Sequence, residues 1–498
     1  MYFIKLKTRA VGAQKTRLNL GPRRGLGCAL SGPDLWEHQK RAIEKARTLQ
    51  NVALFCQMGT GKTRIIIEIL REKFNTRGAY IKTLIISPSA VTHKWRNEIG
   101  KYSKISLDKV HVLDGSLTER AELYATKEGV FITNFEAFAF PKFHEAVLKQ
   151  PPEILVIDES HRIKSFQAKR TKTLIKLSLA MERAHKAPNR YILTGSPVLN
   201  TQEDLFTQFF VLDGGKTFGQ NYYAFRGKYF RDKNEYMPRA KHFPDWVPRQ
   251  GAEEAIKALI APVVVQADKN ECLDLPPLLY TEVDVVLAPE QRRAYEEMKK
   301  EFIAFVESGV ATANLAITKA LRMQQILSGF LNLEGGGVHR FKDNPRADVL
   351  ADLLSDILPS EKVIVWSVFH EDYTTIRNIC EKLKVQYAEV TGLTKDKQAE
   401  LDRFEKDPDC RLMISSQSAG GTGTDMIAAS TMIYFSKGYS LEHDMQSEAR
   451  NYRGGSEIHE KITRIDLVAR GTVDEIVLGA LRDKKDLASR ILQLRDYL

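Results

Sequence analysis

Cysteine is scarce in this sequence, with 5 among 498 residues. The number is odd, and no two cysteines have the C-x-x-C spacing that zinc sites and redox motifs use. The sequence therefore indicates neither a disulfide framework nor a zinc-binding module. Scattered, reduced thiols are typical of an intracellular protein, and we expect that state for Cys28, Cys56, Cys272, Cys380 and Cys410.

Long hydrophobic runs are also missing. No stretch approaches the ~18–20 apolar residues that span a bilayer. Residues 1–33 are basic and lack the apolar core of a secretory signal. The composition, 43% hydrophobic and 28% charged, is that of a globular protein. Its length predicts roughly two to four domains.

Acidic residues are under-represented in the first part of the chain. The whole sequence carries a net charge of +11, but residues 1–275 hold 45 Lys and Arg against 28 Asp and Glu, a net +17. Residues 276–498 hold 29 against 35, a net −6. Residues 1–33 contain no acid, and residues 162–190 contain nine cations and only Glu182. Such runs are often solvated surface, but two of them on one half favour a nucleic-acid partner.

Short β-branched runs alternate with helical patterns in two parts of the chain, which predicts an α/β fold with parallel sheets. Between residues 201 and 346 the pattern is mainly helical. We therefore predict a basic extension (1–33), a first α/β lobe (34–200), a helical insertion and linker (201–346) and a second α/β lobe (347–498). The expected strands are residues 52–55, 83–87, 129–133, 153–157, 190–193, 362–367, 411–415 and 431–435.

The strongest local motif is C-Q-M-G-T-G-K-T at residues 56–63, between an expected strand and an expected helix. Gly59 and Gly61 would let backbone N–H groups converge on phosphate at a helix N-terminus. Lys62 would supply the positive charge, and the Thr63 hydroxyl suits Mg²⁺. Cys56 stands where the strict pattern has glycine.

A second motif, I-L-V-I-D-E-S-H, occupies residues 154–161. Two adjacent carboxylates at the end of a buried strand are costly without a positive partner, and a magnesium–nucleotide complex is such a partner. Asp158 would hold Mg²⁺, and Glu159 would orient the attacking water. Arg450 and Arg453, expected three apart on one helix, could reach the phosphates from the second lobe as arginine fingers do.

In this order the motifs resemble the superfamily-two helicases, specifically the Swi/Snf-type DNA translocases. Further matching segments are L-W-E-H-Q (35–39), L-I-I-S-P-S (84–89), I-T-N-F-E (132–136), T-G-S-P (194–197), V-I-V-W-S (363–367) and S-A-G-G-T-G-T-D (418–425). The sequence departs from the family pattern at Asp425, where Asn is usual, and at Ala449, where Asp is usual. These departures concern the contacts between lobes more than the ATP site.

The resemblance implies two RecA-like lobes with ATP and Mg²⁺ between them. It assigns ATP binding to Gln39, Gly59, Thr60, Gly61, Lys62 and Thr63, with Mg²⁺ on Thr63 and Asp158. It assigns catalysis to Lys62, Glu159, Arg450 and Arg453, and coupling to His161, Thr194, Ser196, Gly423, Asp425 and Gln446. Together with the basic run, it assigns DNA contacts to Ser89, Lys94, Asn134, Lys164, Lys169 and Arg170.

We therefore expect an ATP-dependent DNA translocase or helicase that contacts the phosphate backbone of duplex, forked or branched DNA, in replication, recombination or repair. It would be a monomeric motor without zinc or membrane, in the cytoplasm of a bacterial or phage-infected cell. Strand separation and duplex translocation both remain open. A DNA-binding clamp with a vestigial ATPase and an RNA-directed helicase are the alternatives.

Residues 216–249 combine nine aromatic residues with eight Lys and Arg. Interleaving of this kind could stack on an unpaired base or a DNA junction. We favour the other interpretation, in which the rings form the core of a helical subdomain and the cations are solvated.

Overall fold

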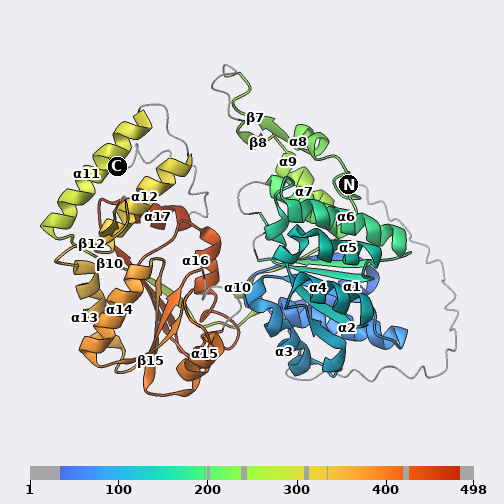
Figure 1. Cartoon of the computed structure of the whole chain (residues 1–498), viewed down its shortest axis with the longest axis horizontal. Helices are drawn as coiled ribbons and strands as arrows, with labels where there is room; N and C mark the ends of the chain where they lie inside the picture. The colour runs from blue at the N-terminus through green and yellow to red at the C-terminus, as the bar shows by residue number, and fades with distance from the viewer. Residues whose placement is uncertain are drawn as a thin grey trace, which may run out of the picture.

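The computed structural model describes residues 34–195, 197–198, 202–236, 244–307, 313–333, 335–418 and 425–482. Two bodies lie side by side, one blue to green and one yellow to red (Figure 1). Each is built around one parallel sheet covered by helices. The α/β class and the two lobes expected from the sequence are thus confirmed.

The first lobe contains a seven-stranded sheet of order β3-β4-β2-β5-β6-β1-β9. Its strands are β1 (Asn51–Cys56), β2 (Thr83–Ser87), β3 (Val110–Val112), β4 (Val130–Asn134), β5 (Ile154–Asp158), β6 (Asn189–Leu193) and β9 (Val264–Ala267). Its helices are α1 (Glu37–Thr48), α2 (Lys62–Arg77), α3 (Thr92–Tyr102), α4 (Leu117–Thr126), α5 (Pro141–Lys149), α6 (Lys169–Ala184), α7 (Leu205–Asp213), α8 (Tyr222–Tyr229), α9 (Ala252–Ile260) and α10 (Lys269–Cys272).

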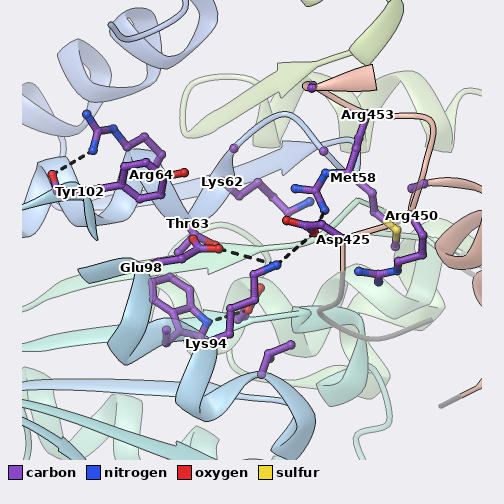
Figure 2. A pocket seen from close by; sticks show the side chains of 18 of the residues that line it. Met58, Lys62, Thr63, Arg64, Lys94, Glu98, Tyr102, Asp425, Arg450 and Arg453 are labelled. Carbon is purple, nitrogen blue, oxygen red and sulfur yellow. Dashed lines mark hydrogen bonds and ion pairs between the residues drawn. The ribbon is translucent and has the colours of Figure 1, made fainter. Parts of the chain in front are cut away.

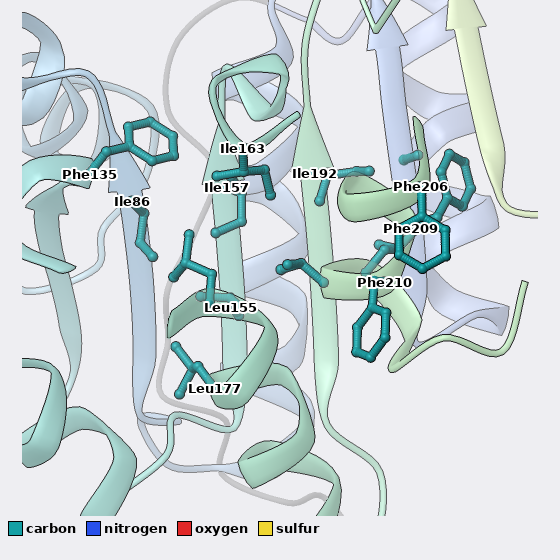
Figure 3. Close-up of a cluster of buried hydrophobic side chains, with 14 of the residues drawn as sticks. Ile86, Phe135, Leu155, Ile157, Ile163, Leu177, Ile192, Phe206, Phe209 and Phe210 are labelled. Carbon is teal, nitrogen blue, oxygen red and sulfur yellow. The ribbon is translucent and has the colours of Figure 1, made fainter. Parts of the chain in front are cut away.

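Strand β5 shows why this sheet has a core on both faces. Successive side chains point to opposite faces of a strand. Leu155 and Ile157 join one buried cluster, with the phenylalanines of α7 (Figure 3), and Ile154 and Val156 join the other. A continuous apolar run is the pattern expected for a strand covered by helices on both faces.

The second lobe contains a six-stranded sheet of order β10-β17-β16-β13-β15-β14. Its strands are β10 (Leu278–Asp284), β13 (Val363–Ser367), β14 (Gln386–Val390), β15 (Cys410–Ser416), β16 (Thr431–Tyr434) and β17 (Ile462–Val468). Its helices are α11 (Pro289–Glu307), α12 (Ala313–Leu327), α13 (Pro345–Ile357), α14 (His370–Leu383), α15 (Lys397–Lys406), α16 (Leu441–Glu448) and α17 (Val473–Arg482).

The middle segment, expected as a helical insertion and linker over residues 201–346, differs from that expectation. Strand β9 pairs with β1 and completes the first sheet, and β10 pairs with β17 at the edge of the second. Two short hairpins, β7 (Phe230–Asp232) with β8 (Trp246–Pro248) and β11 (Phe330–Asn332) with β12 (Val338–Arg340), also lie in this segment. The strands were missed because they lie at sheet edges or in short hairpins and lack the continuous buried apolar runs of the central strands.

Most of the aromatic residues of segment 216–249 have a packing role. Phe225, Tyr229 and Phe230 are buried in the first-lobe core, and Phe218 packs against it. Tyr223 is exposed, and Phe243 lies outside the described residues. The core interpretation therefore holds for the rings that the structure describes as buried.

Candidate active site between the lobes

A cavity of about 510 Å³ lies where the two lobes meet. The first lobe contributes the loop between β1 and α2 and the acids at the end of β5. The second lobe contributes the segment on either side of residue 450 (Figure 2). The cavity brings together these residues singled out from the sequence: Gln39, Gly59, Gly61, Lys62, Thr63, Lys94, Asp158, Glu159, Asp425, Gln446, Arg450 and Arg453.

The loop from Gln57 to Gly61 is shaped by two left-handed glycines. Gly61 caps α2 with φ 77°, and a Cβ atom there would lie 2.3 Å from Nε2 of Gln39. Gly59 has φ 84°, and a Cβ atom there would lie 2.7 Å from Cβ of Arg453. Any other residue would therefore be strained and would also collide. The loop presents its N–H groups at a helix N-terminus, which is a ready anion site.

Lys62 is the first residue of α2. Its ammonium donates to the carbonyl oxygens of Cys56 at 2.8 Å and Gln57 at 3.3 Å. These bonds hold the charge at the mouth of the loop, beside the helix N-terminus. A phosphate bound by the loop N–H groups would lie within reach of this cation.

Helix α1 braces the loop from behind. Gln39 donates to the carbonyl oxygen of Thr60 at 3.2 Å and accepts from the N–H of Trp36 at 3.0 Å. His38 Nε2 lies 2.8 Å from the same Thr60 oxygen. Trp36 reaches the second lobe, since a Cβ atom on Gly454 would lie 2.7 Å from its ring. Gln39 therefore links the loop, through Trp36, to the second-lobe side of the cavity.

Asp158 ends β5, and Glu159 follows with φ 54°. A left-handed glutamate costs backbone energy, and such strain gathers at functional sites. Burial, together with the charge of Glu159, raises the pKa of Asp158 to about 6. The indole N–H of Trp95 donates to Asp158 at 2.9 Å. Adjacent half-buried carboxylates with the Thr63 hydroxyl on the same cavity fit a hard divalent cation such as Mg²⁺.

The two arginines do not share a helix, contrary to the sequence expectation. Helix α16 ends at Glu448, and both arginines follow in irregular chain before Gly454. Both nevertheless line the cavity. Burial, with repulsion from Arg453, lowers the pKa of Arg450 to about 10, which still leaves it charged at neutral pH. The Nε–H group of Arg450 donates to the carbonyl oxygen of Gln446 at 3.1 Å.

Asp425 links two cations across the cavity (Figure 2). Its carboxylate lies 3.1 Å from the ammonium of Lys94 on α3 and forms an ion pair with Arg453. Burial raises the pKa of Asp425, but Arg453 and Lys94 outweigh this and hold it below its usual value. Lys94, expected at the DNA, thus forms part of the cavity wall, where Glu98 lies 3.7 Å away.

The coupling residues within the described part of the chain also meet between the lobes. His161 Nδ1 lies 3.0 Å from the Thr194 hydroxyl, and its Nε2 lies 2.9 Å from Glu442. Gln446 donates to the same Glu442 carboxylate at 2.8 Å. Ser196 and Gly423, also expected in coupling, lie outside the described residues. Glu442 was missed from the sequence, although its position four residues before Gln446 places both on one helix face.

The remaining expected DNA contacts lie at the carboxyl edge of the first sheet. Ser89 follows β2, Asn134 ends β4, and Lys164 comes soon after β5, which are adjacent parallel strands. Asn134 has a local role, because its Oδ1 accepts from the N–H of Ala137 at 3.1 Å. Lys164 lies 3.8 Å from Asp204. Lys169, which is exposed, and Arg170, which is half-buried, open α6.

Each lobe matches a known protein family. The SNF2-related domain matches residues 38–335, and the helicase conserved C-terminal domain matches residues 346–455. The chain is 23% identical to an uncharacterized ATP-dependent helicase of Mycoplasma genitalium over 92% of this chain and 42% of that protein. It is 24% identical to chromodomain-helicase-DNA-binding protein 8 of Xenopus tropicalis over 89% of this chain and 21% of that protein. The chain therefore spans less than half the length of these relatives.

Among solved structures, the chain is similar to the Sulfolobus solfataricus SWI2/SNF2 ATPase core in complex with dsDNA. The identity is 21%, the TM-score is 0.43, and the match covers 93% of this chain and 95% of that one. Within the described residues no helix is both long and apolar enough to cross a membrane.

Proposed function

The chain belongs to the SNF2-related family, and from that membership we propose that it is an ATP-dependent DNA motor. It would hydrolyse ATP between its lobes and couple hydrolysis to movement along duplex, forked or branched DNA. Replication, recombination and repair are the processes that use such substrates. One observation carries the proposal: the loop at residues 57–61 and two half-buried carboxylates of the first lobe line one cavity together with two arginines of the second lobe.

The cavity has the chemistry that a nucleoside triphosphate needs. Its volume falls within the range of about 300–1,000 Å³ usual for small-molecule sites. The loop N–H groups and Lys62 would bind the β- and γ-phosphates, and Gln39 would face the base. Thr63 and Asp158 would hold Mg²⁺, which neutralises phosphate charge when bound.

Hydrolysis requires a water activated in line with the γ-phosphate and cations to stabilise the transition state. Glu159, at the cavity wall, is the group that would orient this water and take its proton. Arg450 and Arg453 would stabilise charge on the transferring phosphoryl group from the opposite lobe. Since each lobe supplies only part of this set, hydrolysis would depend on how the lobes lie against each other.

DNA would bind along the carboxyl edge of the first sheet and the start of α6. The first 275 residues carry a net +17, which suits contacts with phosphates. Such contacts fix position and carry no base sequence, so binding would be largely sequence-independent and sensitive to salt.

The test is phosphate release measured with no cofactor, single-stranded DNA, duplex DNA, forked DNA and RNA. We expect duplex or forked DNA to stimulate hydrolysis, and Lys62→Ala to abolish it. Phosphate release no greater than that of Lys62→Ala, with or without DNA, would support the clamp with a vestigial ATPase, and preferential stimulation by RNA would support the RNA-directed helicase. Triplex displacement from blunt duplex, compared with unwinding of a fork, separates translocation from strand separation.

A further inference from the structure

A buried histidine joins the two lobes. His161 lies two residues after Glu159, and its side chain is 3% exposed. Its Nδ1 lies 3.0 Å from the Thr194 hydroxyl and 3.4 Å from the Glu159 carboxylate, both in the first lobe. Its Nε2 lies 2.9 Å from Glu442, the second residue of α16 in the second lobe. One imidazole therefore contacts the acid assigned to water activation and a helix of the opposite lobe.

Glu442 accepts a hydrogen bond from Nε2 of His161 and so holds the ring in place. Burial raises the pKa of Glu442, but the hydrogen bond and charge of His161 outweigh it and leave that pKa below its usual value. An ionised carboxylate only accepts hydrogen bonds, so Nε2 of His161 donates to it. The orientation of the ring beside Glu159 thus depends on a side chain of the other lobe.

The same carboxylate also orders α16. Gln446 donates to Glu442 at 2.8 Å, one helical turn further along. The carbonyl oxygen of Gln446 in turn accepts from Arg450 at 3.1 Å. The side-chain oxygen of Gln446 is buried and has no hydrogen-bond partner among the described residues, and Gln446 lines the cavity. Glu442 is therefore two hydrogen bonds away from a cavity arginine.

The charges around Glu442 stabilise its ionised form. Arg162 follows His161 on the first lobe, and His443 follows Glu442 on α16; both lower the pKa of Glu442. Glu442 itself is not part of the cavity wall formed by the described residues. It can influence the nucleotide only through its neighbours.

We propose that Glu442 is a positioning residue for ATP hydrolysis, which bridges His161 of the first lobe to α16 and so sets Gln446 and Arg450 against the cavity. It acts through His161 and touches no reacting atom. The inference rests on the proposed hydrolysis of ATP in this cavity. It adds that the two lobes align through a hydrogen bond made by a residue outside the cavity wall.

The experiment measures kcat and KM for ATP with saturating duplex DNA. Glu442→Leu removes both the acceptor and the charge, and we expect kcat to fall about tenfold, within the range of coupling free energies between sites. KM for ATP should stay within about twofold, because the contacts of Lys62 and Gln39 are unchanged. Glu442→Gln keeps an acceptor without the charge, and kcat should fall about threefold.

Glu371 provides a matched control. It lies in the first turn of α14 in the same lobe, and its side chain is 23% exposed against 21% for Glu442. Its partner, Arg340 at 2.7 Å, belongs to the same lobe. Glu371→Gln should therefore keep the wild-type kcat and KM.

A double-mutant cycle tests the route through His161. In a His161→Gln background, Glu442→Leu should lower the single-turnover rate of ATP hydrolysis by less than about twofold, because the His161 partner of Glu442 is already gone. An undiminished cost in that background would overturn the inference. So would a kcat for Glu442→Leu and Glu442→Gln equal to that of Glu371→Gln, or a change in KM alone.

If Glu442→Leu does not fold, the test is the kcat of Glu442→Gln compared with the kcat of Glu371→Gln. Failure of the proposed function is distinguishable from these outcomes. In that case the wild-type protein itself would release no more phosphate than Lys62→Ala.

Discussion

The two lobes share a parallel-sheet architecture but contribute opposite charges to the ion pairs that join them. The first lobe supplies cations or a histidine at three cross-lobe contacts, and the second supplies the acid each time. The pairs are His161 with Glu442 at 2.9 Å, Lys94 with Asp425 at 3.1 Å and Lys269 with Glu448 at 3.7 Å. In these three pairs the signs follow the difference in net charge between the two halves of the sequence.

The lobes also divide the proposed chemistry. The first lobe holds the loop at residues 57–61, the carboxylates Asp158 and Glu159, and Gln39, which braces the loop. The second lobe holds both arginines, and Arg453 approaches Gly59 so closely that a side chain at that glycine would collide. The first lobe would therefore bind the nucleotide, and the second would complete its hydrolysis.

Among changes in the second lobe, the largest effect should come from removing one of its two cavity arginines. Arg450→Ala leaves the first-lobe contacts to the phosphates unchanged, so ATP should still bind. Hydrolysis should fall by about 10³-fold or more, as for other arginine fingers. The rate of phosphate release at saturating ATP and DNA measures this. A loss below about tenfold would mean that the second lobe does not complete the site.

The next effect concerns the stability of the first lobe and its pH dependence. The pKa of Asp158 is raised to about 6 in the folded protein, above the unfolded value, so its protonated form stabilises the native state. That stability is present at low pH and is lost as pH rises to about 6. Asp158→Asn should therefore be more stable than wild type at pH 8, by about 2 kcal/mol, and nearly equal at pH 4.

Denaturant unfolding in EDTA without nucleotide checks this prediction. Adding Mg²⁺ and ATP should reverse the order at pH 8, because only wild type would gain stability from the bound metal. An Asp158→Asn variant that is less stable than wild type at pH 8 in EDTA would contradict the account.

DNA affinity should distinguish the lobes by a smaller factor. Reversing charge at Lys169, Arg170 and Lys172 at the start of α6 removes cations at the edge of the first sheet. DNA binding should weaken at least about tenfold and become less dependent on salt. A second-lobe control with equal charge change uses three exposed lysines: Lys342, Lys382 and Lys395. Equal losses in the two triple variants, measured by fluorescence anisotropy, would remove the assignment of DNA to the first lobe.

The smallest effect should come from a single cross-lobe pair. Lys269→Met removes the pair with Glu448 and the ammonium contact 4.1 Å above the Tyr452 ring. We expect the free energy of unfolding to change by less than about 1 kcal/mol, because Glu448 keeps its contacts with Arg464 and Tyr280 and is not left without a partner. Denaturant titration measures it, and a loss of several kcal/mol would mean that this contact holds the lobes together.

Much of the fold was predictable from particular runs. Strands β2 and β5 coincide with largely apolar stretches of the sequence. The loop motif with Gly59 and Gly61 predicts the helix that follows it. Strands β9 and β10 were not predictable, since edge strands of mixed polarity depend on partners far away in sequence. The helix expected at Arg450 ended early, before the glycines at 454 and 455.

The candidate site also contains residues that the sequence predicts and residues that it does not. Lys62, Asp158 and Glu159 follow from local motifs, because strand ends and a helix start bring them together. The pairing of Lys94 with Asp425, and the role of Glu442, depend on how one lobe lies against the other. No local pattern encodes that geometry, so Lys94 was assigned to DNA and Glu442 was missed.

The central claim is that the first lobe binds ATP and the second completes hydrolysis. Its most direct test compares Lys62→Ala with Arg450→Ala, measuring the Kd for ATP and the rate of phosphate release for each. We predict that Lys62→Ala loses both binding and hydrolysis, whereas Arg450→Ala binds ATP within about threefold of wild type and hydrolyses almost none. Equal loss of ATP binding in the two variants would contradict this division between the lobes.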